Sequence, residues 1–213
     1  MSDLLEEQKR YYAARAPEYD DWWYKRGRYE VAPDVLARWH EDIAEADAAL
    51  DAFTPRGSVL ELAAGTGLWT RKLVRLADRV VAVDANRETL ALNIDEAEHV
   101  LADIFEWHPP ETFDVVFFGF WLSHVPDERF DGFWRTVRAA LAPGGRVFLI
   151  DSGPIEVEPG DDRQLRRVAD GREFRIVKKF WRPAELAERV RPLGFDLDLR
   201  LTANGNFLYG FGS

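Results

Sequence analysis

A glycine-rich turn and the carboxylate that follows it are the first residues in this sequence whose types and spacing suit chemistry. The turn, Glu61-Leu-Ala-Ala-Gly-Thr-Gly67, interrupts an apolar run that begins at Val59, and Asp84 lies 17 residues after Gly67. Glycines let a backbone come close to a ligand, and a carboxylate roughly 20 residues further on hydrogen-bonds ribose hydroxyls in nucleotide-binding folds. The spacing predicts a nucleoside site; the alternative is that Asp84 or Asn86 is the N-cap of the next helix.

A histidine marks a second stretch that could do chemistry. The apolar run 112–119 predicts a central strand, and it opens into Phe120-Trp-Leu-Ser-His-Val-Pro126. Ligands of open α/β sheets lie outside the carboxyl ends of the strands, so we expect Phe120 and Trp121 in a pocket wall. His124 is either a structural histidine or a general base that takes a proton from an O–H or N–H group.

The elements that must position these residues alternate between apolar runs and amphipathic stretches. This alternation predicts an α/β fold with a parallel sheet. The predicted strands are 59–62, 79–84, 112–119, the apolar end of 141–151, 195–202 and 206–210. The predicted helices are 3–15, 33–53, 68–77, the stretch from 84 to about 94, 127–141 and 182–190.

The glycine-rich turn does not fit the dinucleotide fingerprint G-x-G-x-x-G/A, because the third small position falls on Thr70. Its pattern, E-x-A-x-G-x-G, instead resembles the first motif of class I S-adenosylmethionine-dependent methyltransferases. That family mostly has glycine where this sequence has Ala63, and we interpret the alanine as crowding that the turn tolerates. His99-Val-Leu-Ala-Asp-Ile104 and Leu141-Ala-Pro-Gly-Gly145 resemble further elements of the family, so the resemblance covers roughly residues 55–151.

The resemblance implies a doubly wound, mostly parallel seven-stranded sheet with helices on both faces. It also implies that S-adenosylmethionine is the cofactor and S-adenosylhomocysteine the product. In the family, the acid at Asp103 bonds the adenine amine and the apolar Ile104 packs on the ring. The expected cofactor-binding residues are Tyr11, Tyr19, Glu61, Ala63, Gly65, Gly67, Asp84, Ala85, Asp103, Ile104 and Gly119. The expected acceptor-binding residues are Trp22, Phe120 and Trp121, with His124 as the candidate catalytic residue.

Two segments outside the core, 1–54 and 152–182, are expected to close the site. The pattern Y-Y-x-x-x-A-x-x-Y-D at 11–20 resembles the N-terminal lid of small-molecule methyltransferases; a hydrophobic clasp is the alternative. Turn formers at 152–162 and a hairpin around Asp170-Gly171 follow the core. This hairpin is either solvated or a substrate cap whose cations hold an anionic acceptor. The cations are Arg163, Arg166, Arg167, Arg172, Arg175, Lys178 and Lys179.

Length and composition narrow the class of protein. The 213 residues suit a single domain, divided into 1–54, 55–151, 152–182 and 183–213. The net charge of −10 argues against a nucleic-acid partner, and no apolar run approaches a membrane span. The absence of cysteine and of a signal-peptide pattern favours the cytoplasm, and no metal-ligand constellation is evident.

We therefore predict methyl transfer to a small-molecule acceptor, with in-line attack favoured by proximity and possible help from a general base. Two alternatives stay open. One is a protein of this fold that binds the cofactor without methyl transfer, as a cyclase or a binding module. The other is an NAD(P)-dependent oxidoreductase. The acceptor atom and the oligomeric state are left open by the sequence.

Overall fold

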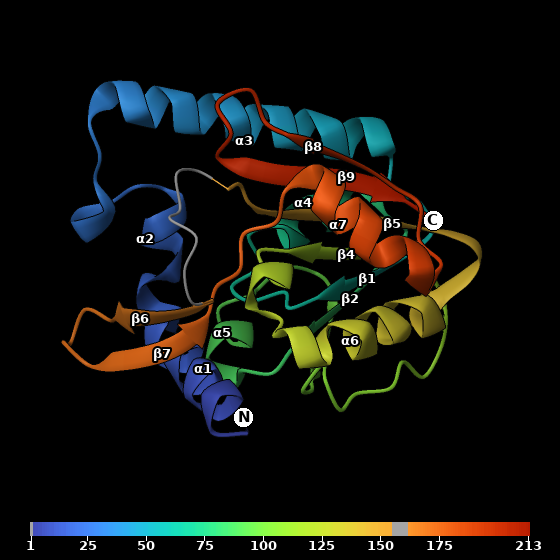
Figure 1. The fold of residues 1–213 in the computed structure, drawn as a ribbon, viewed down its shortest axis with the longest axis horizontal. Helices are drawn as coiled ribbons and strands as arrows, with labels where there is room; N and C mark the ends of the chain where they lie inside the picture. Colours follow the sequence, from blue (N-terminus) through green and yellow to red (C-terminus); the bar gives the residue numbers. More distant parts are fainter. Residues whose placement is uncertain (1, 155–161) are drawn as a thin grey trace.

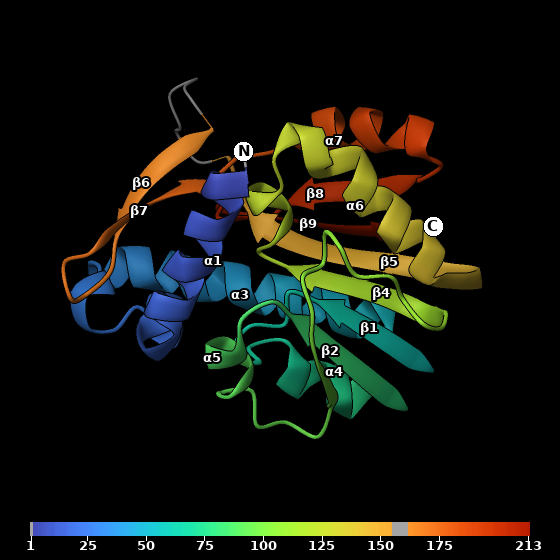
Figure 2. The ribbon, with the colours of Figure 1, turned by 90° about the horizontal axis from the view of Figure 1, so that it is seen from below.

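A seven-stranded sheet forms the centre of the protein, with the strand order β3-β2-β1-β4-β5-β9-β8 (Figures 1 and 2). The computed structural model describes residues 2–154 and 162–213. All pairs from β3 through β5 are parallel, and β9 runs antiparallel to both β5 and β8. The strands are β1 (Ser58–Leu62), β2 (Arg79–Asp84), β3 (Glu98–Leu101), β4 (Phe113–Gly119), β5 (Leu141–Ser152), β8 (Leu197–Leu201) and β9 (Phe207–Gly212). The predicted fold class is confirmed.

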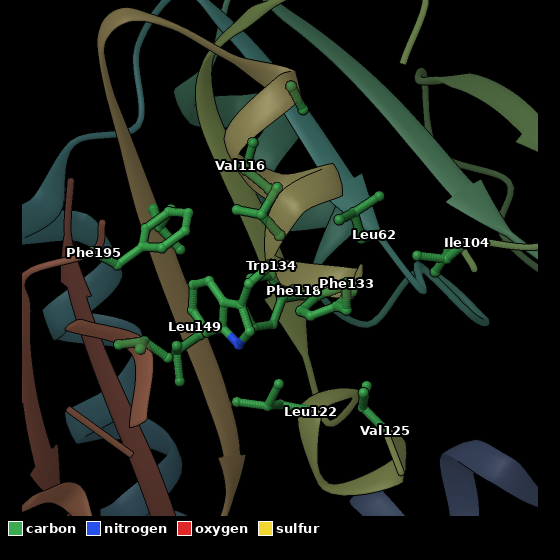
Figure 3. Close-up of a cluster of buried hydrophobic side chains, with 14 of the residues drawn as sticks. Leu62, Ile104, Val116, Phe118, Leu122, Val125, Phe133, Trp134, Leu149 and Phe195 are labelled. Atoms are coloured by element: carbon green, nitrogen blue, oxygen red, sulfur yellow. The ribbon is translucent and has the colours of Figure 1, made fainter. Parts of the chain in front are cut away.

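Helices cover both faces of the sheet because its central strands are apolar on both sides. In β4, Val116 and Phe118 face a cluster built with α6 and α7, whereas Val115 and Phe117 face a cluster built with α3 and α4. Figure 3 shows the first cluster, with Trp134 of α6 packed among side chains from β4 and β5. These helices are α3 (Pro33–Phe53), α4 (Thr70–Leu76), α6 (Asp127–Ala140) and α7 (Pro183–Val190). The two layers fix the ends of β1, β2 and β4, where the site lies.

The chain begins with a lid, which we define as α1 (Ser2–Arg15), η1 (Ala16–Glu18) and α2 (Tyr19–Trp23). Helix α1 contacts β7 on one side and α5 (Arg87–Leu90) on the other, as Figures 1 and 2 show. Helix α2 is anchored by Trp23, whose ring is buried among Trp39, Trp69 and Phe207. The lid therefore spans the carboxyl ends of the strands.

A two-stranded sheet outside the main one, β6 (Arg163–Arg167) and β7 (Glu173–Val177), forms the hairpin predicted around Asp170-Gly171. We call this pair the cap hairpin. It contacts α1 through an apolar cluster of Tyr11, Val168, Phe174 and Ile176. Residues 155–161 of the predicted 152–182 segment lie outside the described residues.

The remaining short elements are η2 (Gly27–Tyr29), η3 (Leu122–His124) and η4 (Arg191–Leu193). One prediction was too long: the helix expected from residue 84 to about 94 ends at Leu90. Its continuation turns inward, because the Asn93 side chain is buried and donates to the Thr70 hydroxyl. In the described part of the chain, no helix has the length and apolar character that crossing a bilayer requires.

Candidate active site

Two cavities meet where β1, β2 and β4 end. The first is lined by the turn after β1, the ends of β2 and β4, the stretch after β3, and α1. The second, with a volume of about 470 Å³, lies between the lid and the cap hairpin. Four residues line both: Tyr12, Tyr19, Phe120 and His124. We call these four residues the junction.

The turn after β1 is held in a conformation that places it against β2. Ala63, Gly65 and Gly67 all have left-handed backbone angles, with φ of 57°, 57° and 87°. The Ala64 amide donates to the Val83 carbonyl, and the Gly65 amide donates to Asp84 Oδ2 at 2.9 Å. Because alanine has a left-handed φ here, Ala63 adds backbone strain of about 1–2 kcal/mol. The effect of the alanine is therefore strain in the backbone and not the side-chain crowding expected from the sequence.

Asp84 joins the turn to the helix after β2. Its Oδ1 accepts hydrogen bonds from the Asn86 amide and the Thr89 hydroxyl, while its Oδ2 accepts from Gly65. Burial raises the pKa of Asp84, and these hydrogen bonds oppose the rise. The carboxylate lines the first cavity.

The stretch after β3 supplies the far end of the first cavity. Asp103 and Ile104 both line it, with Ile104 buried. Asp103 Oδ1 accepts from the Phe105 amide, and Asp103 Oδ2 pairs with the Lys9 ammonium at 2.8 Å. Lys9 therefore brings the lid over the carboxylate predicted to bind adenine.

Three predicted cofactor residues do not line the first cavity. Glu61 accepts from the Thr70 hydroxyl at 2.5 Å beneath the turn, and burial raises its pKa to about 8. A Cβ at Gly67 would meet the Asn93 side chain at 2.6 Å, so this glycine serves close packing. Tyr11 faces the cap hairpin, and Tyr12 takes its expected place at the first cavity. The roles assigned to Glu61, Gly67 and Tyr11 stay predictions.

The spacing of α1 could have identified Tyr12. Leu5, Gln8, Lys9 and Tyr12 all line the first cavity and recur at helical intervals, whereas Tyr11 lies on another side of the helix. The other predicted residues are brought together there: Tyr19, Ala63, Gly65, Asp84, Ala85, Asp103, Ile104, Gly119, Phe120, Trp121 and His124. Trp22 lines the second cavity.

The second cavity combines aromatic rings with cations. The Arg15 guanidinium lies 5.0–5.7 Å from the ring centres of Tyr11, Tyr19, Trp22 and Tyr29. Its Nε is buried and has no hydrogen-bond partner among the described residues. Arg28, Arg166 and Lys178 also line this cavity, but sequence reasoning missed Arg15. Its spacing of four residues from Tyr11 was the available signal.

Lys178 reaches the second cavity from the end of β7. Its ammonium donates to the hydroxyls of Ser123 and Ser152, at 2.8 and 2.9 Å, and lies 3.7 Å from Asp151 Oδ1. The residue is 9% exposed, and burial lowers its pKa to about 8. It thus belongs to the site, whereas the sequence placed it only among the cations of a hairpin.

His124 lies in η3, directly beyond β4, and is 5% exposed. Its Nδ1 is 2.6 Å from the Val177 carbonyl oxygen, and its Nε2 is 2.6 Å from the Tyr12 hydroxyl. Burial, assisted by the Lys178 ammonium, lowers the pKa of His124 well below its usual value. The ring therefore stays neutral near pH 7.

The first cavity presents the polar groups that a nucleoside ligand requires. Carboxylates stand at Asp84 and Asp103, and a Cβ at Gly65 would enter open space, so the backbone there is accessible to a ligand. The profile of a methyltransferase-domain family matches residues 24–199. The chain belongs to this family.

Solved structures similar to this methyltransferase contain the predicted cofactor or its product. A solved structure of DhpI in complex with SAH is 41% identical, covers 100% of this chain and 98% of that chain, and has a TM-score of 0.83. A complex of DhpI with SAM and a ligand abbreviated HEP is 40% identical, covers 99% and 97% of the two chains, and has a TM-score of 0.83. The predicted family and the S-adenosylmethionine cofactor are confirmed, and the oxidoreductase alternative is set aside.

A curated relative adds a second comparison. Cypemycin N-terminal methyltransferase from Streptomyces sp is 34% identical over 118 residues, which cover 51% of this chain. The match spans 48% of the length of that relative. The glycopeptide N-methyltransferase MtfA, at 20% identity and a TM-score of 0.61, shares the fold.

Proposed function

We propose that this methyltransferase transfers the methyl group of S-adenosylmethionine to a small molecule that carries an anionic group, which is held in the second cavity. One observation carries the proposal. Arg15 faces that cavity from an aromatic cage, with a buried Nε that lacks a hydrogen-bond partner among the described residues. A buried, unpaired donor is costly, and a carboxylate-like or phosphate-like oxygen is the partner a guanidinium prefers.

The surrounding charges support an anion. No carboxylate of the described residues forms an ion pair with Arg15 or Arg166, although the chain carries a net charge of −10. Among the carboxylates of the described residues, the Lys178 ammonium pairs only with Asp151, at 3.7 Å. A concentration of cations in an acidic protein produces a local positive potential that attracts an anionic ligand. For Arg166 and Lys178 this favours the substrate-cap interpretation of the hairpin over the solvated one. The other predicted cap cations that form ion pairs with carboxylates are Arg167, Arg172, Arg175 and Lys179.

For methyl transfer to such an acceptor, the main task of the protein is to place the acceptor atom in line with the methyl group. The bound cofactor supplies an electrophilic methyl group. The residues of this chain hold the acceptor beside the junction, and the lid and cap hairpin exclude water. A base at His124 would have to act through the Tyr12 hydroxyl, because that hydroxyl occupies Nε2. An acceptor whose anionic oxygen attacks directly needs no base.

The names of the relatives are compatible with an acceptor that is a small molecule or the end of a chain. DhpI has been solved with SAM and HEP together, and the cypemycin enzyme is an N-terminal methyltransferase. The volume of about 470 Å³ in the second cavity suits a small molecule or a short chain end.

Substitution of Arg15 tests the proposal. We expect Arg15→Gln to raise the KM for an anionic acceptor about 10- to 100-fold, the range of a lost charged hydrogen bond, while the affinity for S-adenosylhomocysteine stays near the wild-type value. Arg200→Gln is the matched control, because Arg200 is exposed and pairs only with Asp198 among carboxylates of the described residues. An unchanged KM in Arg15→Gln would contradict the proposal.

A further inference from the structure

Two hydrogen bonds connect the cap hairpin to the lid through His124. A carbonyl oxygen can only accept, so the 2.6 Å contact with Val177 requires a hydrogen on His124 Nδ1. The neutral ring then has a bare Nε2, which lies 2.6 Å from the Tyr12 hydroxyl. The Tyr12 O–H must therefore donate to His124. The tautomer of His124 is fixed by the backbone of β7.

Because the Tyr12 hydroxyl donates its hydrogen to His124, it can only accept hydrogen bonds from other groups. A phenol has one hydrogen and accepts through its oxygen, so the remaining capacity of the Tyr12 hydroxyl is that of an acceptor. Burial raises the pKa of Tyr12 well above its usual value, so the hydroxyl stays protonated. Tyr12 lines both cavities. The junction thus contains an oriented oxygen whose lone pairs are free of His124.

The cations of the second cavity make the orientation of the Tyr12 hydroxyl important for cofactor binding. Arg15, Arg166 and Lys178 line the second cavity, which shares the junction with the first cavity, where we place the cofactor and its positively charged sulfonium. Cations at short range repel one another, the more so where water is excluded. An acceptor oxygen next to the sulfonium offsets this repulsion, whereas a hydroxyl hydrogen pointing at it would add to the repulsion.

We propose that His124 is a positioning residue that holds the Tyr12 hydroxyl so that its oxygen faces the sulfonium of the bound cofactor. The proposal rests on the methyltransferase family and not on an anionic acceptor. In this proposal the Tyr12–His124 pair makes the protein prefer S-adenosylmethionine, with its cationic sulfonium, over the product S-adenosylhomocysteine, whose sulfur is uncharged.

Calorimetric titration of the full-length protein with both ligands, without acceptor, tests the pair. Tyr12→Phe removes the oxygen, and we expect it to weaken S-adenosylmethionine binding about 3- to 10-fold relative to S-adenosylhomocysteine. His124→Ala releases the hydroxyl and is expected to change the ratio of the two dissociation constants in the same direction. Tyr24→Phe is the control, because Tyr24 is an exposed tyrosine directly after the lid and lines neither cavity.

His124→Gln separates positioning from a merely structural role. A glutamine amide offers one acceptor to Tyr12 and a donor to Val177, as the neutral imidazole does, so we expect it to restore the wild-type ratio. An unchanged ratio in Tyr12→Phe, or an equal loss of affinity for both ligands, would overturn the proposal. A ratio in His124→Gln equal to that of His124→Ala would also overturn it.

Discussion

Lys9 of the lid and Asp103 beyond β3 form an ion pair of 2.8 Å across the first cavity. Asp103 Oδ1 already accepts from the Phe105 amide, so an adenine amine bound by this carboxylate would share Oδ2 with Lys9, and we expect the two donors to compete. Partly exposed pairs of this kind are worth about 0.2–1 kcal/mol. We therefore expect Lys9→Ala to tighten S-adenosylhomocysteine binding roughly 1.5- to 5-fold, measured by calorimetry. Arg10→Ala, an exposed change on the same helix, is the control, and weaker binding in Lys9→Ala would contradict the competition.

Replacement of the strained alanine in the turn should stabilise the protein. Ala63 has a φ of 57°, which glycine adopts freely. Ala63→Gly removes strain of about 1–2 kcal/mol but adds flexibility to the unfolded chain, so we expect a net gain of about 0.5–1 kcal/mol in the free energy of unfolding. Urea denaturation measures the gain. Ala64→Gly should show no such gain, because Ala64 lacks a positive φ. A loss of stability in Ala63→Gly would show that the turn is unstrained.

The buried carboxyl of Glu61 should make stability fall as pH rises. Burial raises its pKa from 4.5 in the unfolded chain to about 8 in the folded protein. Between these values the folded state holds a proton that the unfolded state has released, so the free energy of unfolding decreases with pH. Glu61→Gln removes this dependence. The free energy of unfolding of Glu61→Gln minus that of wild type should therefore increase by more than about 1 kcal/mol between pH 5 and pH 8.

Urea denaturation at the two pH values provides the comparison for Glu61. Glutamine keeps an oxygen that can accept from the Thr70 hydroxyl, so the packing of α4 is preserved. A difference between wild type and Glu61→Gln that is the same at both pH values would contradict a protonated, buried Glu61.

The protonation of Lys178 should control acceptor binding. Its pKa of about 8 means that the ammonium present at pH 7 is lost as the pH rises above 8. An anionic acceptor needs the charged form, so its KM should be lowest below pH 8 and increase above it. We expect Lys178→Met to raise the KM about 10- to 100-fold at pH 7 and to remove the pH dependence. A wild-type KM that stays constant from about pH 7 to 9.5 would exclude this role.

The sequence predicts those parts of the molecule that depend on local pattern. The apolar runs predict the central strands. The glycine-rich turn at 61–67 and Asp84 predict the first cavity, because the backbone of that turn and the ends of the strands form its wall. The sequence analysis missed Tyr12 and Arg15, although their spacing of three residues makes them neighbours on the surface of α1. The choice of Tyr11 relied on the resemblance to the family's lid pattern and did not use the helical spacing that groups Tyr12 with Gln8 and Lys9.

The role of Lys178 could not be predicted from the sequence. It lies 54 residues beyond His124 in the chain, and the two meet only because β7 runs beside η3, where the Lys179 amide donates to the Ser123 carbonyl. Its lowered pKa comes from burial in that tertiary contact. A charge in a hairpin has no local signal that distinguishes a solvated lysine from one that lines a cavity.

Methyl transfer to an anionic small molecule can be detected by following a labelled methyl group. The protein is incubated with methyl-labelled S-adenosylmethionine and a panel of small acids, each paired with its neutral amide or ester, and labelled products are identified by mass spectrometry. We predict labelled products from acids, no labelling of their neutral counterparts, and S-adenosylhomocysteine formed in equal amount. Labelling of neutral compounds alone, or binding of the cofactor with no transfer to any acceptor, would contradict the claim.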